Sequence, residues 1–217
     1  MQAMILAAGR GERMLPLTEN TPKPLLMVNG KPLIQHHIER LVNAGFTEIV
    51  INHGPMGDQI ENYLGDGSVF NAKIFYSAEH DNLLDTGGGI FKALTLLGNE
   101  PFVVVNADVW TNYPFSNLPD NPRGLAHLVL VDNPPQHPQG DFALVNGKVH
   151  QSGEHMLTFS GIGVYRPGLF EGCSDGSFPL APLLRNAMDR EQVTGEFFQG
   201  IWSDIGTPDR LKQLQAD

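Results

Sequence analysis

The fold is decided by residues 4–18, Met-Ile-Leu-Ala-Ala-Gly-Arg-Gly-Glu-Arg-Met-Leu-Pro-Leu-Thr, and by Thr-Pro-Lys-Pro-Leu at 21–25. The apolar run 4–8 is typical of a buried parallel strand. It passes directly into a loop with Gly9 and Gly11, where glycines let backbone N–H groups approach a phosphate closely. Arg13 and Lys23 add positive charge nearby. The stretch therefore predicts a phosphate-binding loop after a buried strand.

Two other phosphate-binding loops do not match this stretch. A dinucleotide fingerprint needs a third glycine after Gly-x-Gly, and the chain has Glu12-Arg13 instead. The pattern Gly-x-x-x-x-Gly-Lys-Ser/Thr is also missing from the sequence. A nicotinamide-dependent oxidoreductase and a P-loop NTPase are therefore disfavoured.

The first half of the chain, 1–110, alternates strands with helices. Further strands are expected at 48–52, 73–77 and 102–106, and helices at 33–44, 56–64 and 90–97. The glycines 87–89 are expected to open the last of these helices. This order predicts a doubly wound, Rossmann-like α/β sheet with right-handed crossovers.

The second half, 111–217, is richer in strands. It predicts strands at 125–132 and 158–165, a proline-rich loop at 133–139, a hairpin over 142–151 around Asn146-Gly147, and helices at 182–189 and 208–215. No linker divides the two halves, so we expect one domain over 1–217 with a mixed sheet and a small strand-and-hairpin lobe.

The composition disfavours nucleic-acid binding, disulfide-linked and membrane-spanning classes of protein. The 217 residues include 14 Lys+Arg and 24 Asp+Glu, a net charge of −10, which disfavours a basic face for nucleic acid. The single cysteine, Cys173, excludes an intramolecular disulfide and a thiolate zinc site. No stretch is long enough to span a bilayer, and 3–8 is too short for a signal-peptide core. We expect a cytoplasmic protein without a membrane partner, and a monomer rather than a small homo-oligomer.

The loop stretch 6–25 closely resembles the signature of the sugar-1-phosphate nucleotidylyltransferases, the nucleoside-diphosphate-sugar pyrophosphorylases. Three further segments resemble that family in the same order. They are Leu-Asp-Thr-Gly-Gly-Gly-Ile at 84–90, Asn-Ala-Asp at 106–108 and Gly-Ile-Trp-Ser-Asp-Ile-Gly-Thr-Pro at 200–208. The resemblance covers nearly the whole chain and implies a glycosyltransferase-A-like nucleotidyltransferase fold, with a nucleotide-binding first half and a sugar-binding second half.

The resemblance also implies the reaction, in which a sugar 1-phosphate attacks the α-phosphorus of a nucleoside triphosphate and pyrophosphate leaves. The first expectation is transfer of UMP from UTP to N-acetylmuramic acid α-1-phosphate, as in peptidoglycan recycling. By resemblance, Arg13 holds the β,γ-phosphates and Lys23 the α-phosphate, as the two catalytic residues. Asp108 and Asp204 are the expected ligands of Mg²⁺, which prefers hard oxygen donors.

The remaining expected contacts are also carried over from the family. The nucleotide contacts are Leu6, Ala7, Ala8, Gly9, Gly11, Glu12, Asn82, Thr86 and Gly87, and the sugar contacts are Asn106, Glu154 and Gly161. The chain departs from the common pattern because no Glu-Lys-Pro segment follows Asp132, and Lys148 is a possible substitute for that lysine.

Alternatives stay open at this point. The sugar and base could be those of another hexose-1-phosphate guanylyl-, thymidylyl- or uridylyltransferase, or the chain could be a catalytically silent regulatory subunit. For a muramic acid substrate, Gly161 and Gly163 would leave space for the lactyl ether. Its carboxylate would need a cation, for which Lys148, Arg166 and Arg185 are the candidates.

Overall fold

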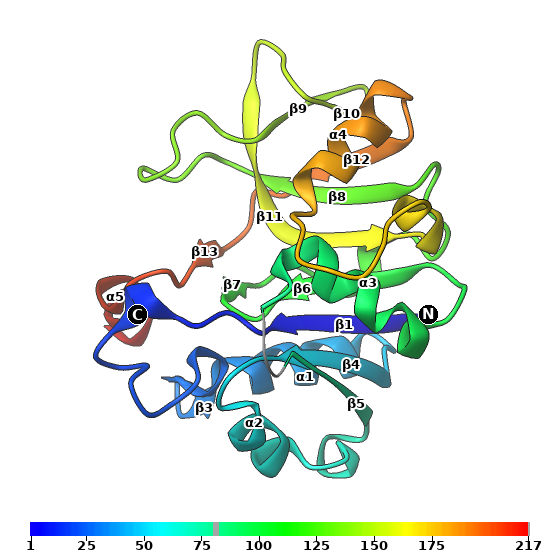
Figure 1. The fold of residues 1–217 in the computed structure, drawn as a ribbon. Helices are drawn as coiled ribbons and strands as arrows, with labels where there is room; N and C mark the ends of the chain where they lie inside the picture. The colour runs from blue at the N-terminus through cyan, green and yellow to red at the C-terminus, as the bar shows by residue number, and fades with distance from the viewer. Residues whose placement is uncertain (80–82, 217) are drawn as a thin grey trace.

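The computed structural model describes residues 1–79 and 83–216 and contains a nine-stranded mixed sheet (Figure 1). In spatial order its strands are β5 (Lys73–Ala78), β4 (Glu48–His53), β1 (Gln2–Ala7), β6 (Phe102–Asn106), β11 (Met156–Tyr165), β8 (Ala126–Val131), β12 (Val193–Phe197), β10 (Lys148–His150) and β9 (Phe142–Val145). The helices are α1 (Leu33–Asn43), α2 (Gly57–Leu64), α3 (Asp85–Leu97), α4 (Ala181–Asp189) and α5 (Pro208–Ala216). Two small sheets pair β2 (Met27–Val28) with β3 (Lys31–Pro32), and β7 (Val109–Thr111) with β13 (Trp202–Asp204).

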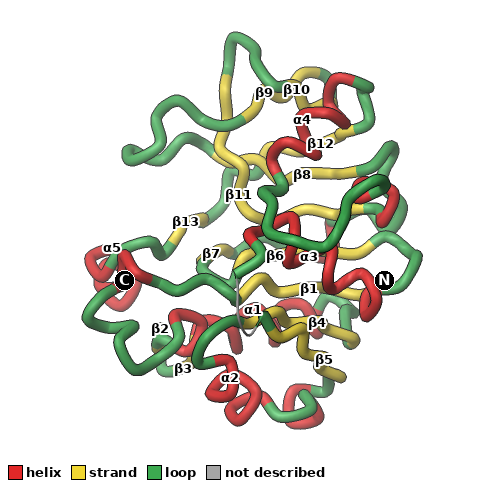
Figure 2. Tube along the Cα trace, viewed as in Figure 1, coloured by secondary structure: helices red, strands yellow, loops and turns green. Residues whose placement is uncertain are grey.

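The first four strands of the sheet are parallel. β4 pairs in parallel with β5 and β1, and β1 pairs in parallel with β6. The carboxyl ends of these strands therefore meet at one edge, which is where ligands bind in open α/β sheets. Figure 2 shows that this edge is built largely of loops, including the long loop that leaves β1. The sheet becomes mixed at β11, which runs antiparallel to both β6 and β8.

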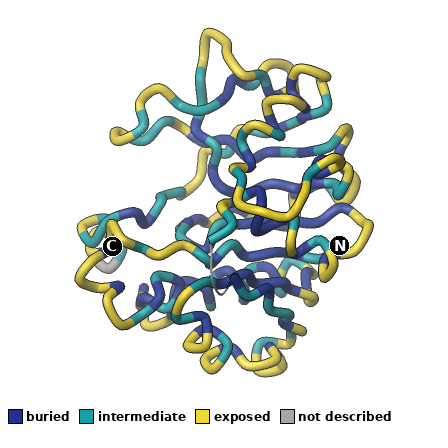
Figure 3. Tube along the Cα trace, viewed as in Figure 1, coloured by how far each residue is buried: buried dark blue, intermediate teal, exposed yellow. Residues whose placement is uncertain are grey.

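Helices cover both faces of the sheet because successive strand residues point to opposite sides. On one face, Ile5 of β1 lies in a fully buried cluster with Ile34 and Ile38 of α1. On the other face, Met4 lies in a cluster with Ile90 of α3 and Leu184 of α4. Figure 3 shows the buried strands as the dark interior between exposed loops. The expected doubly wound, Rossmann-like sheet is confirmed.

Other expectations have mixed outcomes. The turn at Asn146-Gly147 is confirmed, with positive φ at both residues, and its hairpin extends the main sheet next to β12. The glycines 87–89 lie inside α3 rather than before it, because that helix begins at Asp85. β12, β7 and β13 were not predicted. Over the residues that the structure describes, no helix combines the length and apolar character needed to cross a bilayer.

Candidate active site

The loop after β1 wraps tightly around Gly11. This glycine has φ 66°, and a Cβ there would lie 3.0 Å from Thr18 Cγ2 and 3.3 Å from Lys23 Cβ. The Thr18 hydroxyl donates a hydrogen bond of 2.8 Å to the Gly11 carbonyl. The close approach brings the two ends of the loop together, so that Lys23 returns to the end of β1 where the sequence predicted a phosphate site.

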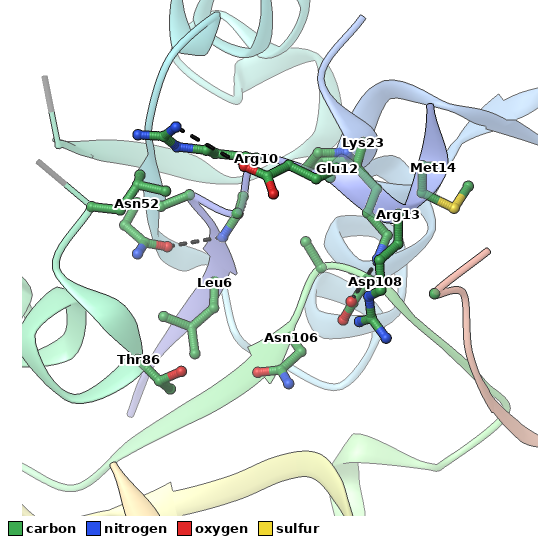
Figure 4. A pocket seen from close by; sticks show the side chains of 18 of the residues that line it. Leu6, Arg10, Glu12, Arg13, Met14, Lys23, Asn52, Thr86, Asn106 and Asp108 are labelled. Carbon is green, nitrogen blue, oxygen red and sulfur yellow. Dashed lines mark hydrogen bonds and ion pairs between the residues drawn. The ribbon is translucent and has the colours of Figure 1, made fainter. Parts of the chain in front are cut away.

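A cavity of about 530 Å³ opens between this loop and the carboxyl ends of β1, β4 and β6 (Figure 4). The predicted residues that line it are Leu6, Ala7, Ala8, Gly9, Gly11, Glu12, Arg13, Lys23, Thr86, Asn106 and Asp108. Figure 4 shows Arg13 and Asp108 on one side of the cavity, with Leu6, Asn106 and Thr86 on the other. The cavity therefore gathers residues from the first loop, from the start of α3 and from the end of β6.

Lys23 and Asp108 form an ion pair inside this cavity. The Lys23 Nζ donates to Asp108 Oδ2 at 2.7 Å, and the lysine side chain is only 11% exposed. Lys23 begins a short 3-10 turn, and Asp108 follows β6 by two residues. The contact places a carboxylate and an ammonium together at the point where β6 ends.

Asp204 reaches the same region through the small sheet. β13 runs antiparallel to β7, with Asp204 opposite Val109, and the Ile205 N–H donates to the Asp108 carbonyl at 2.8 Å. The Asp204 carboxylate accepts hydrogen bonds from Arg210 at 2.5 Å and from Gln136 at 2.8 Å. The two predicted metal ligands therefore lie on neighbouring backbone segments.

Gly206 lies close to both Asp204 and Arg13. It lines the 530-Å³ cavity, and a Cβ on it would lie 3.1 Å from Asp204 Oδ2 and 3.5 Å from Arg13 Nη1. Across the described parts of the chain, no cluster of three or more His, Cys, Asp or Glu side chains could hold a metal. Two carboxylates nevertheless suit Mg²⁺, which keeps several waters and takes substrate phosphate oxygens as further ligands. The chemistry of these two carboxylates therefore suits Mg²⁺, although of the two only Asp108 lines the cavity, and Asp204 is held by Arg210 and Gln136.

Asn52 and Glu79 form a buried hydrogen-bond network in the wall of the cavity, and this network was not predicted from the sequence. Asn52, at the end of β4, accepts a 2.9 Å hydrogen bond from the Ala7 N–H and donates one of 2.8 Å to Glu79 Oε1. Glu79 Oε2 accepts a 2.8 Å hydrogen bond from the Leu84 N–H at the start of α3. Both side chains are 3% exposed and both line the cavity. The network fixes the position of α3 relative to β1.

Gly89 is required for this network. A Cβ there would lie 2.7 Å from Glu79 Oε1 and 2.9 Å from Asn52 Nδ2. The positions of Asn52 and Glu79, just where two strands end, could have indicated the network, since the carboxyl ends of parallel strands share one edge.

A second cavity of about 240 Å³ adjoins the first, because Leu6, Thr86 and Asn106 line both. Gly161 of β11 lies in its wall with φ 79°, and a Cβ there would lie 2.7 Å from Asn106 Nδ2. Asn106 therefore fills the space beside Gly161, and the Tyr165 hydroxyl would lie 2.9 Å from a Cβ on Gly163. Gly161 therefore borders the cavity in which a sugar substituent is expected, whereas Gly163 does not line it.

Other predicted residues lie away from the two cavities. Gly87 lines neither, because it packs against the Phe178 side chain, 2.6 Å from the position of an added Cβ. Glu154 is exposed in the loop between β10 and β11 and also lines neither. Lys148 also lines neither cavity, and it pairs with Glu191 on the hairpin side. Asn82 lies outside the described residues.

His37 of α1 carries no charge at neutral pH. Its side chain is buried, with 3% exposure, and this burial lowers its pKa to about 4. The neighbouring His36 packs edge-on against Trp110 of β7, with ring centroids 4.9 Å apart. Neither histidine lines the cavities.

Comparisons with known proteins agree with this architecture. A relative from Neisseria meningitidis serogroup B, N-acetylmuramate alpha-1-phosphate uridylyltransferase, is 53% identical over 100% of this chain and 97% of its own length. A protein of the same name from Caulobacter vibrioides is 34% identical over 99% of this chain and 95% of its own length. A crystal structure of a Bacillus anthracis protein, assigned as a glucose-1-phosphate thymidylyltransferase, is similar with a TM-score of 0.86 and 24% identity, over 100% of this chain and 94% of that one.

The family model described as Nucleotidyl transferase matches residues 2–159, which include the first loop, the start of α3 and the end of β6. The match therefore spans most of the first cavity. This chain belongs to the nucleotidyl transferase family of enzymes.

Proposed function

We propose that the protein transfers UMP from UTP to N-acetylmuramic acid α-1-phosphate, forming UDP-N-acetylmuramic acid and pyrophosphate. The observation that carries this choice of substrates is the 53% identity, over the whole chain, to a relative with that named activity. The two adjoining cavities support it, because the larger suits a nucleoside triphosphate and the smaller a sugar.

In this proposal the reaction is a direct displacement. An oxygen of the sugar phosphate forms a bond to the α-phosphorus of UTP, and the bond to the β-phosphate oxygen breaks. No covalent enzyme intermediate is needed, so positioning and charge stabilisation supply the rate enhancement. Lys23 lies in the first cavity and would hold the α-phosphate oxygens as negative charge develops.

Arg13 would hold the β- and γ-phosphates and then the leaving pyrophosphate. Its planar guanidinium suits paired oxygens better than an ammonium does. It lines the same cavity as Lys23. The two cations provide local positive charge for a triphosphate in a chain whose net charge is −10.

Asp108 and Asp204 would hold Mg²⁺, which supplies charge neutralisation on the phosphates when bound. The present partners of these carboxylates, Lys23 and Arg210, would then become free to contact anionic oxygens. We further propose that residues 1–217 form one domain, that the protein is a monomer and that it takes part in peptidoglycan recycling. We also propose a cytoplasmic location, since UTP is a cytoplasmic nucleotide.

A panel assay tests the function. UTP, GTP and dTTP are each combined with N-acetylmuramic acid 1-phosphate, N-acetylglucosamine 1-phosphate, glucose 1-phosphate and mannose 1-phosphate, and pyrophosphate release is measured with Mg²⁺. We expect the highest kcat/KM for UTP with N-acetylmuramic acid 1-phosphate. A higher value for another pair would assign the chain to a different substrate, and no turnover with any pair would favour the regulatory-subunit alternative.

A further inference from the structure

The 240-Å³ cavity contains one cation with no assigned task, Arg185 of α4. The cavity shares Asn106 with the first cavity and has Gly161 in its wall, so it continues away from the phosphate end toward α4. Figure 1 shows α4 beside the strands of the second half. Arg185 therefore lies on the side of the site where a sugar substituent would reach.

The other two candidate cations are already engaged elsewhere. Lys148 pairs with Glu191, and neither residue lines the cavity. The Arg166 guanidinium donates to the Pro122 carbonyl at 3.2 Å and to the Asn121 side chain, and it also lies outside the cavity. Of the three cations that the sequence offered as partners for a carboxylate, only Arg185 lines this cavity.

The Arg185 guanidinium makes no hydrogen bond or ion pair with any residue described by the structure. Asp141 lines the same cavity, but its oxygens accept hydrogen bonds from the Phe159 N–H at 2.8 Å and from His137 at 3.0 Å. The one carboxylate of the cavity wall is thus held by other donors. This leaves the positive charge of Arg185 available to a ligand.

Arg185 is an exposed residue at the edge of the cavity, and the wall beside it is largely apolar. Phe142, Phe159, Leu180 and Leu184 form much of the wall. Apolar walls lower the local dielectric, so a charge pair that forms against them is less screened than one in open water. A guanidinium at the edge of an apolar cavity suits a carboxylate, which it can bind with two parallel hydrogen bonds.

Resting on the proposed function, we propose that Arg185 binds the lactyl carboxylate of N-acetylmuramic acid 1-phosphate and thereby determines sugar specificity. N-acetylglucosamine 1-phosphate lacks that carboxylate and would leave Arg185 without a partner. Arg185 does not contact the reacting phosphorus in this account, so its contribution belongs to sugar binding and not to phosphoryl chemistry.

The test compares the wild-type protein with Arg185→Gln, Arg185→Lys and the control Arg190→Gln. Arg190 lies at the end of the same helix, is exposed and does not line the cavity. For each variant, kcat/KM with UTP is measured for N-acetylmuramic acid 1-phosphate and for N-acetylglucosamine 1-phosphate. The ratio of the two values is the measured specificity.

We expect Arg185→Gln to lower this ratio by about 10- to 100-fold, which is the effect of one lost charged hydrogen-bond pair. The loss should be a raised KM for the muramic acid substrate, with kcat little changed. Arg185→Lys should restore part of the ratio, and Arg190→Gln should keep the wild-type ratio. Calorimetric binding of UDP-N-acetylmuramic acid should weaken in Arg185→Gln by a similar factor, and this readout does not depend on turnover.

The outcomes separate this inference from the proposed function. A wild-type ratio at or below one would overturn the proposed function. A wild-type preference for the muramic acid substrate that persists in Arg185→Gln would overturn only the role of Arg185. Equal losses for both sugars in Arg185→Gln would also overturn it, because they would show a structural effect.

Discussion

The Lys23 ammonium lies 2.7 Å from the Asp108 carboxylate, although 85 positions separate the two residues in the chain. The pair joins the loop after β1 to the end of β6, and each partner lines the 530-Å³ cavity. The proposed phosphate-binding cation and a proposed metal ligand are thus held in one contact. Removal of either charge should therefore affect both functions at once.

The first prediction concerns Lys23. Lys23→Gln removes the positive charge that we propose to lie beside the α-phosphate, and loss of one such stabilising group typically costs about 100- to 1,000-fold in kcat. The matched control is Lys31→Gln, since Lys31 also forms a 2.7 Å ion pair, with Glu39, but on the surface. Steady-state kinetics of both variants check this. If Lys23→Gln turns over as fast as Lys31→Gln, Lys23 has no catalytic role.

The second prediction concerns the metal. Asp108→Asn and Asp204→Asn keep the shape of each side chain and remove the charge that we propose to bind a divalent ion. We expect both variants to stay folded, to lose nearly all turnover and to need much higher Mg²⁺ for the remainder. Calorimetry with Mg²⁺ and UTP gives a second readout. Asp58→Asn on the exposed side of α2 is the control. Normal Mg²⁺ affinity in both test variants would contradict the assignment.

The third prediction concerns Arg13. Arg13→Lys keeps one positive charge but loses the bidentate contact with paired phosphate oxygens. We expect kcat to fall by about 10- to 100-fold, from loss of one or two charged hydrogen bonds, with a smaller rise in the KM for UTP. Rates are compared with those of Arg190→Lys. A wild-type kcat in Arg13→Lys would mean that Arg13 is an ordinary surface charge.

The fourth prediction concerns the network behind the cavity. Glu79→Gln replaces an acceptor by a donor, so either the Leu84 N–H or the Asn52 amide loses its partner in a buried place. Such a loss should lower the free energy of unfolding by about 1–3 kcal/mol. The KM for UTP should rise more than kcat falls, because Glu79 positions the start of α3. Urea unfolding and kinetics, with exposed Glu100→Gln as control, check this. A change in kcat alone would contradict the positioning role.

The fifth prediction concerns pH. Burial lowers the pKa of His37 from 6.5 to about 4, so the unfolded chain binds a proton at this site at higher pH than the folded chain does. The contribution of neutral His37 to the free energy of unfolding is therefore fully present above about pH 6.5, and it is lost as the pH falls toward 4. The loss amounts to about 3 kcal/mol, at about 1.4 kcal/mol per pKa unit.

His37→Leu tests this assignment. The variant should show a shallower decrease in the free energy of unfolding between pH 6.5 and 4, whereas His155→Gln, at an exposed histidine, should keep the wild-type slope. An unchanged slope in His37→Leu would mean that another group controls the acid sensitivity.

The sequence predicts the parallel half of the sheet well because its signals are local. β1, β4 and β6 are short apolar runs, and the helices between them have regular apolar spacing. The clustering of Arg13, Lys23 and Asp108 also follows from local signals, because the carboxyl ends of parallel strands share one edge.

The other parts of the site depend on contacts between distant residues. β12 contains Gly195, which lowers its strand propensity, and it is held by pairing with β8. β7 and β13 are three residues each, and only their mutual pairing forms them. Glu154 and Gly87 are predicted as contacts only because they are carried over from the family. That resemblance does not show that Glu154 lies in an exposed loop. Nor does it show that Gly87 packs against Phe178.

Mass spectrometry of the products formed from UTP and N-acetylmuramic acid 1-phosphate with Mg²⁺ tests whether uridylyl transfer takes place in the cavity of Lys23 and Asp108. We predict equal amounts of UDP-N-acetylmuramic acid and pyrophosphate with the wild-type protein, and neither product with Asp108→Asn. Formation of UDP with a doubly phosphorylated sugar, or equal product formation by Asp108→Asn, would contradict the account.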